Sequence, residues 1–236
     1  MSERLCGLAG FHKTVSAHSF YKAMKQKYIS KIKNMFYVLI LFITLSCAAY
    51  VVCWEKEISA RMVIKEDLYK QSVGEFVDDI IHDVKCFPVR EDKSGTTFWV
   101  YEDGYGDGRT FGGKRRHEGI DIMSSDNRPG YLAVQSVCSG TVEKKGWLKL
   151  GGYRIGIRSD SGIYYYYAHL DSYADGVDTG DRVKAGDILG YMGNTGYGPE
   201  GTRGKFDVHL HFGIYIGKGE KERSINPYHI LRYADD

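Results

Sequence analysis

The sequence predicts an antiparallel all-β domain at residues 87–236, preceded by an N-terminal transmembrane helix and a helical stalk. Residues 34–54 contain no charged side chain. Between residues 58 and 84, apolar side chains recur at three- and four-residue steps, which is typical of a helix. Beyond Pro88, glycine becomes frequent and short β-branched or aromatic runs alternate with turn residues, which is typical of antiparallel strands.

The N-terminal segment combines a basic head with a long apolar run. Residues 1–34 carry seven lysines and arginines against one acid, Glu3, in a chain whose net charge is only +2. A helix of about 20 apolar residues spans the hydrocarbon core of a bilayer. Basic residues that flank such a span stay in the cytoplasm. We therefore expect residues 1–33 to be a cytoplasmic head, residues 34–54 a single-pass anchor, and the following residues to lie outside the membrane.

Two other targeting signals share part of this pattern. A cleavable signal peptide has a shorter apolar run followed by a small-residue cleavage site. Residues 46–49 offer similar small residues, but residues 50–53 continue the apolar run. A lipoprotein signal places a leucine-like residue three positions before the modified cysteine, whereas Thr44 stands three positions before Cys47. The anchor therefore explains the segment best.

Residues 55–86 are expected to form a helical stalk or linker between the anchor and the β domain. The apolar side chains that define its helical spacing are Val73, Phe76, Val77, Ile80, Ile81 and Val84. Gly74 weakens the helical pattern in its middle.

The β domain is expected to begin at residue 87 and to consist of short strands joined by glycine-rich turns. The expected strands include residues 97–101, 131–137, 140–143, 153–157, 163–169, 182–183 and 208–216. The sequence contains no compact basic patch interleaved with aromatic residues, and this argues against nucleic acid as a partner.

The five cysteines are scattered and show no Cys-x-x-Cys spacing, so a thiolate zinc site is not expected. Cys86 and Cys138 are the two that follow the anchor. An oxidising exterior would permit a disulfide between them. Two separate buried thiols fit the sequence equally well, and the alternatives stay open at this point.

Two short histidine motifs in the β domain carry metal-binding potential. His117 and Asp121 form a His-x-x-x-Asp motif, and His209 and His211 form a His-x-His motif. Side chains alternate along a strand, so we expect His209 and His211 to share one face while Leu210 faces the core. Each motif alone is weak evidence, since exposed strand histidines are common.

Together the motifs supply a donor set that suits zinc. A His, an Asp and a second His match the three protein ligands of a catalytic zinc, which leaves its fourth position to water. Such a site makes hydroxide available near neutral pH. The sequence has no His-Glu-x-x-His helix, so a thermolysin-like arrangement is excluded.

The motifs and their order resemble the lysostaphin/LytM-type zinc endopeptidases, which cut peptidoglycan peptides. The resemblance extends over residues 87–227. The segments that carry it are His117-x-x-x-Asp121 with residues 119–122, Ala168-His169-Leu170, Val183-x-x-Gly186, residues 192–196, residues 209–212 and Asn226-Pro227.

This resemblance implies a role for each motif residue. His117, Asp121 and His211 match the ligands of one zinc ion per chain. His209 matches the histidine that positions or deprotonates the water. His169 matches the second catalytic histidine, which stabilises charge in the tetrahedral intermediate. The fold implied is a set of antiparallel sheets that form a substrate groove.

The chain departs from the family pattern at two places. Phe111 stands six residues before His117, where many relatives have a tyrosine whose hydroxyl assists the oxyanion. We expect that a nearby tyrosine or arginine substitutes, or that the site is slower. Asp207 and Val208 precede the His-x-His motif in place of a Gly-Pro pair, after a longer loop at residues 197–206 that is expected to border the groove.

Other polar residues near the motifs are assigned less specific roles. Glu118 is expected to point away from His117 and not to act as a general base. If residues 164–169 form a regular strand, Tyr165 and Tyr167 share the face of His169, while the tyrosines at 164 and 166 face away.

These observations predict a membrane-anchored zinc endopeptidase, with its catalytic domain on the cell-wall side, that hydrolyses peptide bonds in peptidoglycan stems or cross-bridges. The main alternative is a catalytically weak module that binds the wall and scaffolds or activates other hydrolases. A peptidase that acts on proteins is a second alternative. The bond that is cleaved, the oligomeric state and any protein partners do not follow from the sequence.

Overall fold

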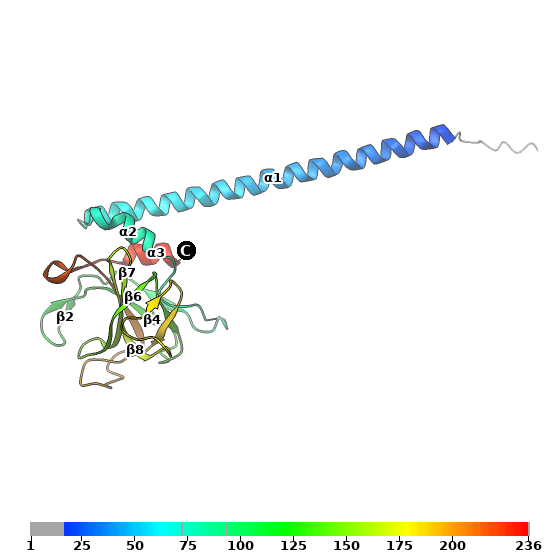
Figure 1. Ribbon diagram of the computed structural model, residues 1–236. Helices are drawn as coiled ribbons and strands as arrows, with labels where there is room; N and C mark the ends of the chain where they lie inside the picture. Colours follow the sequence, from blue (N-terminus) through cyan, green and yellow to red (C-terminus); the bar gives the residue numbers. More distant parts are fainter. Residues whose placement is uncertain (1–16, 72, 93, 236) are drawn as a thin grey trace, which may run out of the picture. The chain divides into compact units, whose positions relative to one another are not determined.

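The structure, a computed structural model, describes residues 17–71, 73–92 and 94–235. Part of the predicted cytoplasmic head, residues 1–16, lies outside the described residues. Two compact units are present, one ending at Glu57 and one beginning at Ile58. The second unit contains all the motif residues, and its β strands are seen together in Figure 1.

A single long helix, α1 (Ala17–Lys70), covers the rest of the predicted head, the predicted anchor and the first part of the predicted stalk. Within the described residues it is the one helix long and apolar enough to cross a membrane, judged by length and composition. The helix ends at Lys70. Gly74 opens a short 3-10 helix, η1 (Gly74–Phe76), which leads into α2 (Val77–Asp83).

The rest of the described chain is mostly antiparallel β structure, as predicted. The strands are β1 (Trp99–Tyr101), β2 (Gly108–Arg109), β3 (Arg115–Arg116), β4 (Ile120–Ser124), β5 (Ala133–Gln135), β6 (Gly140–Leu148), β7 (Gly152–Ser159), β8 (Tyr164–Tyr173), β9 (Arg182–Val183), β10 (Ile188–Met192), β11 (His209–Ile216) and β12 (Arg223–Ile225). A second 3-10 helix, η2 (Gly219–Lys221), and the helix α3 (Tyr228–Asp235) complete the order.

The central sheet runs in the order β1-β4-β11-β8-β7-β6-β9, and β2 pairs with β3 as a separate hairpin. Its core combines alternate strand residues with side chains from the end of α1, from α2 and from α3. Leu68 of α1 and Ile80 of α2 are fully buried in the same cluster as Ile122, Phe212 and Leu231. The segment predicted as a stalk therefore contributes side chains to the domain core. Figure 1 shows α2 and α3 together at one end of the strands.

The register of three neighbouring strands places the motif residues side by side. His211 of β11 lies opposite Asp121 of β4 on one side and Ala168 of β8 on the other. Leu210 is fully buried, while the side chains of His209 and His211 line a groove. The predicted alternation of the His-x-His motif is thus confirmed.

The predicted facing of the tyrosine run is wrong. Tyr165 and Tyr167 are fully buried in the core, whereas the tyrosines at 164 and 166 line the same groove as His169. The strand is irregular at this point, because its pairing with β7 shifts register and His169 adopts a left-handed backbone with φ of 64°. A bulge of this kind adds one residue and turns the following side chain to the other face.

The cysteine alternatives are resolved in favour of separate thiols. Cys86 and Cys138 are both free in the structure. The Cys86 thiol lies 3.3 Å from the carbonyl oxygen of Ser136. Burial raises the pKa of both thiols, which keeps them protonated and poorly reactive.

We expect Leu68→Ala to destabilise the domain by about 2–5 kcal/mol, because the change leaves a cavity where the end of α1 enters the core. Met62→Ala on the same helix is the matched control, since Met62 is 67% exposed. Urea unfolding of the full chain in detergent, followed by tryptophan fluorescence, measures both. Equal stability of the two variants would show that the end of α1 is not part of the core.

Candidate metal centre and groove

Three side chains from β4, β11 and the loop before β4 converge on one point. The His117 Nε2 atom lies 3.0 Å from Asp121 Oδ1 and 2.8 Å from His211 Nδ1. The His211 Nδ1 atom lies 3.0 Å from the same Asp121 oxygen. These three residues form the group within the described chain that could hold a metal ion. The sequence predicted the same three.

The three possible ligand atoms, His117 Nε2, Asp121 Oδ1 and His211 Nδ1, form a triangle whose atom types and spacing suit zinc. A tetrahedral zinc ion with bonds of about 2.0–2.2 Å separates its ligand atoms by about 3.3 Å. The observed separations of 2.8–3.0 Å therefore need only a slight expansion.

Groups behind the triangle fix its orientation. The His117 Nδ1 atom lies 2.9 Å from the carbonyl oxygen of Gly104 and 2.9 Å from the Arg109 Nη2 atom. With a metal ion on Nε2, the Nδ1 atom would carry the hydrogen and donate it to the Gly104 carbonyl. The Arg109 Nη2 atom donates to the second oxygen of Asp121 over 2.8 Å. Hydrogen bonds to the side of a ligand that faces away from the metal fix its tautomer and its rotation. Arg109 was not identified from the sequence.

Gly119 allows the triangle to close. A Cβ atom at this position would collide with the backbone oxygen of Phe212 and would stand 2.9 Å from two ring atoms of His211. Any side chain here would therefore push β11 away from the loop or turn the His211 ring.

Two further histidines face the triangle without joining it. The Nδ1 atom of His209 lies 2.7 Å from the carbonyl oxygen of Asp207, and that of His169 lies 2.8 Å from the carbonyl oxygen of Thr195. A carbonyl can only accept, so both Nδ1 atoms carry the hydrogen. Each neutral ring then has its lone pair on Nε2. The His209 Nε2 atom is 3.8 Å from Asp121, and the two rings are 4.7 Å apart.

The electrostatic environment favours neutral imidazoles beside an ionised carboxylate. Burial, followed by the neighbouring rings of His209 and His211, lowers the pKa of His169 well below its ordinary value. Burial is also the largest cause that lowers the pKa of His209 and His211. For Asp121, burial raises the pKa, but hydrogen bonds from His117 and His211 outweigh it and hold the pKa well below the usual range.

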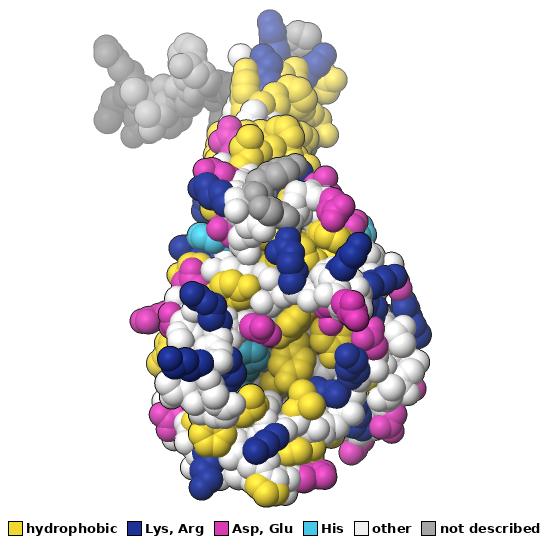
Figure 2. All heavy atoms as spheres, turned by 90° about the vertical axis from the view of Figure 1, so that its left-hand side faces the viewer, with side chains coloured by type: hydrophobic (Ala, Val, Ile, Leu, Met, Phe, Trp, Pro, Cys, Tyr) yellow, Lys and Arg dark blue, Asp and Glu magenta, His cyan; other side chains and the backbone are white. Residues whose placement is uncertain are grey.

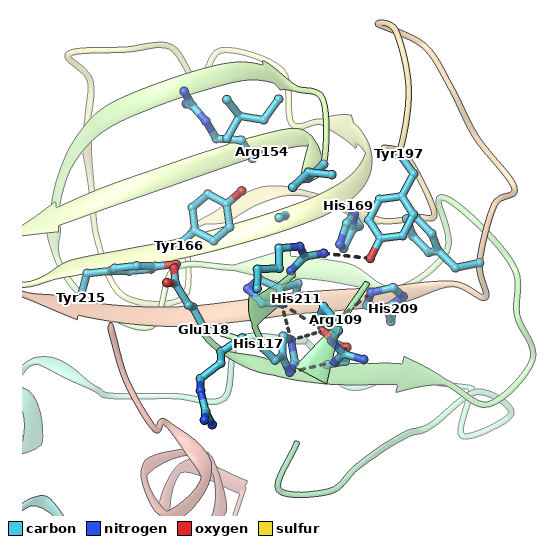
Figure 3. A pocket seen from close by; sticks show the side chains of 18 of the residues that line it. Arg109, His117, Glu118, Arg154, Tyr166, His169, Tyr197, His209, His211 and Tyr215 are labelled. Carbon is cyan, nitrogen blue, oxygen red and sulfur yellow. Dashed lines mark hydrogen bonds and ion pairs between the residues drawn. The ribbon is translucent and has the colours of Figure 1, made fainter. Parts of the chain in front are cut away.

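The triangle lies in the wall of a groove with a volume of about 890 Å³. Figure 2 shows this hollow, with histidine (cyan) at one side, hydrophobic side chains (yellow) on its floor, and lysines and arginines (dark blue) around the rim. In Figure 3, His117 and His211 turn toward one another, while Tyr215 and Glu118 lie at one end and Tyr197 at the other. Glu118 is exposed and its Oε2 atom lies 3.4 Å from the Tyr215 hydroxyl, whereas His117 is buried.

A tyrosine that the sequence analysis did not identify packs against Phe111. The Phe111 ring stacks on Tyr197 with centroids 4.2 Å apart, and Tyr197 packs edge-on against His169 at 6.1 Å. The Arg115 Nη2 atom donates to the Tyr197 hydroxyl over 3.2 Å. Because the oxygen accepts this bond, its own hydrogen is available to the groove. Tyr197 belongs to the loop that was expected to border the groove, and it does line it.

Comparisons with known proteins agree with this geometry. A family model described as peptidase family M23 matches residues 115–227. The L-Ala–D-Glu endopeptidase of Bacillus subtilis (strain 168) is 47% identical over 145 residues, which are 61% of this chain and 41% of that protein. Lysostaphin of Staphylococcus simulans is 32% identical over 120 residues, which are 50% of this chain and 22% of that protein. The chain thus spans less than half the length of these two relatives.

Among solved structures, a crystal structure from Ruminococcus gnavus ATCC 29149, described as a putative glycyl-glycine endopeptidase LytM, superimposes with a TM-score of 0.58. It is 47% identical, and the match covers 72% of this chain and 71% of that chain.

We expect Gly119→Ala to weaken binding of a divalent metal by about 10- to 100-fold, because the added methyl group displaces the His211 ring. Gly108→Ala is the control, since a Cβ at Gly108 would meet nothing within 4 Å. Competition with a fluorescent zinc chelator measures both affinities. Unchanged affinity in the Gly119 variant would mean that the close approach does not support the metal site.

Proposed function

Because the chain belongs to peptidase family M23, we propose that it is a membrane-anchored zinc endopeptidase that hydrolyses peptide bonds in peptidoglycan stems or cross-bridges. The single observation that carries the proposal is the triangle of His117, Asp121 and His211 with two free imidazoles beside it in an open groove. A regulatory or scaffolding protein does not require three metal ligands and two further histidines. The alternative, a regulatory or scaffolding module, is therefore not favoured by any observation.

In the proposed reaction, His117, Asp121 and His211 hold one zinc ion. When bound, zinc supplies a Lewis acid that polarises a carbonyl oxygen and makes water acidic near neutral pH. The hydrogen bonds that lower the pKa of Asp121 favour its ionised form, which is the form that binds a metal ion. The second oxygen of Asp121 is held by Arg109, so the carboxylate keeps one oxygen for the metal.

His209 and His169 then handle protons. Both present an Nε2 lone pair, since their Nδ1 atoms donate to backbone carbonyls. His209 is the closer to the ligand triangle and is suited to take the proton of the attacking water. His169 can stabilise negative charge only after its own Nε2 takes up a proton, which its lowered pKa opposes. The proton that His209 takes from the attacking water can therefore go from His209 to the leaving amine.

Tyr197 provides the neutral donor that Phe111 cannot. Its hydroxyl hydrogen is free because Arg115 already donates to its oxygen. The stacked Phe111 ring and the neighbouring Phe206 ring, at 4.2 and 4.8 Å, restrict the rotation of Tyr197. A fixed donor that needs no reorientation is what stabilises a developing oxyanion most effectively.

The apolar part of α1 supports the membrane component of the proposal. Residues 34–54 are uncharged and exposed over their whole length, as expected for a segment surrounded by lipid. The lysines of residues 22–33 lie on its N-terminal side and favour a cytoplasmic N-terminus, with the groove outside on the cell-wall side. The anchor would hold the peptidase domain beside its wall substrate.

The relatives differ in the bond that their names specify. The Bacillus subtilis relative is named for an L-Ala–D-Glu bond, and a Staphylococcus capitis relative, 35% identical over 140 residues, is named for a glycyl-glycine bond. The first bond lies beside an acidic residue and the second has no charged neighbour. Both remain within the proposed substrate class of peptidoglycan peptides.

We expect the full chain, purified in detergent, to carry about one zinc ion and to release soluble peptides from purified sacculi. His211→Ala should lose most of the zinc and the activity, because one of three protein ligands is gone. His169→Ala should keep the zinc and lose activity by about 100-fold or more. Metal analysis and release of new amino groups measure both properties. A folded wild-type chain that carries zinc but leaves sacculi intact while it digests denatured proteins would contradict the peptidoglycan assignment.

We expect Tyr197→Phe to lower kcat by about 100-fold at unchanged zinc content and nearly unchanged KM, because only a donor to the oxyanion is removed. Tyr191→Phe, a partly exposed tyrosine outside the groove, is the matched control. Steady-state kinetics on a soluble wall peptide provide the measurement. A variant with wild-type kcat would exclude Tyr197 as the replacement for the missing hydroxyl.

A further inference from the structure

Two guanidinium groups in the wall of the groove contain a buried nitrogen without a hydrogen-bond partner. They are the Nη1 atom of Arg154 and the Nε atom of Arg115, and within the described residues they are the buried side-chain atoms in this condition. Both residues line the groove that holds the metal ligands. A buried N–H without a partner is destabilising. Its occurrence at a binding groove points to a partner supplied by the ligand.

Arg154 is the stronger candidate for a ligand-binding residue, because its positive charge also has no acidic partner. Within the described residues, no ion pair or side-chain hydrogen bond of Arg154 is found, whereas Arg115 already donates to Tyr197. Arg158 lies four residues further along β7 and shows the contrast. Its guanidinium contacts Glu143 at 2.5 Å and Glu222 at 2.9 Å. The acidic side chains of this wall therefore compensate Arg158 and leave Arg154 as a free cation.

Arg154 is placed within reach of a peptide bound at the metal centre. It lies on β7, and the sheet order β4-β11-β8-β7 puts two strand spacings, about 10 Å, between β7 and the strand of His211. The Tyr166 ring fills the space between, with its centroid 5.9 Å from that of His211. Figure 3 shows Arg154 beyond Tyr166, on the side away from His117. An extended peptide rises about 3.3 Å per residue, so this distance corresponds to a few residues at most.

We propose that Arg154 binds a free carboxylate of the substrate, one or two residues from the scissile bond. The inference rests on the proposed peptidase function and narrows its substrate to acidic stem peptides as opposed to neutral oligoglycine bridges. A guanidinium presents paired N–H donors that match the two oxygens of a carboxylate. The carboxylate supplies both the missing hydrogen-bond partner and the missing counter-charge of Arg154.

Binding is measured in the zinc-loaded full chain in detergent, with His169→Ala introduced to prevent turnover. The probes are two fluorescent peptides, L-Ala–isoglutamate–Lys and L-Ala–isoglutamine–Lys, which differ only in whether the carboxyl group beside the Ala bond is free or amidated. We expect the free carboxylate to bind about 10- to 100-fold more tightly, as for a charge-assisted hydrogen bond. Adding Arg154→Gln should abolish the difference and leave the affinity for the amidated peptide unchanged. Arg154→Lys should restore part of it.

Arg182→Gln is the matched control, because Arg182 is exposed, pairs with Asp160 and lies outside the groove. Zinc content confirms that each variant is folded. Equal affinity for the two peptides before Arg154 is changed, or an equal loss for both in Arg154→Gln, overturns the proposal. Preferential cleavage of pentaglycine by the wild-type chain also overturns it. If no peptide is cleaved but the carboxylate-dependent affinity persists, the peptidase function fails and the Arg154 site stands.

Discussion

Strand β11 pairs with β4 in the register that sets His211 directly opposite Asp121. Directly opposed residues have Cβ atoms about 4.5–5.5 Å apart, which is close enough to share one metal ion. A slip of one residue would exchange every side chain between the two faces. The fully buried side chains of Leu210 and Ile122 oppose each other in the core and prevent that slip. The candidate metal centre therefore depends on hydrophobic packing on the opposite face of the same two strands.

Much of this arrangement follows from the sequence. The period of two in a strand places His209 and His211 together, and the uncharged run at residues 34–54 predicts a long apolar helix. The packing of the end of the stalk does not follow from the sequence. Its helical spacing predicts an amphipathic helix but does not identify the part of the protein that packs against the apolar face. That face packs into the β domain through residues such as Leu68 and Ile80. Local periodicity cannot distinguish a spacer from a segment of the core.

The residues that sequence reasoning missed all depend on contacts between distant segments. Tyr197 is identified by its stacking on Phe111, which lies 86 residues earlier in the chain, and by the hydrogen bond that it accepts from Arg115. Arg109 is identified by its contact with Asp121. Arg154 stands out only by comparison with Arg158, whose two acidic partners come from β6 and from the loop before β12. The sequence alone does not show whether a charged side chain forms an ion pair in the folded protein.

The bulge at His169 lies between the proposed catalytic residues and the proposed Arg154 site of the groove. A left-handed backbone at a residue other than glycine costs about 1–3 kcal/mol and persists only when surrounding contacts require it. Here the His169 backbone N–H donates to Gly151, and its ring donates to Thr195. Without the bulge, His169 would point to the core, since the side chain of its neighbour Ala168 already lines the groove. One irregular residue thus lets a strand contribute both the His169 imidazole, proposed to be catalytic, and, through Tyr166, the floor that separates the proposed metal ligands from Arg154.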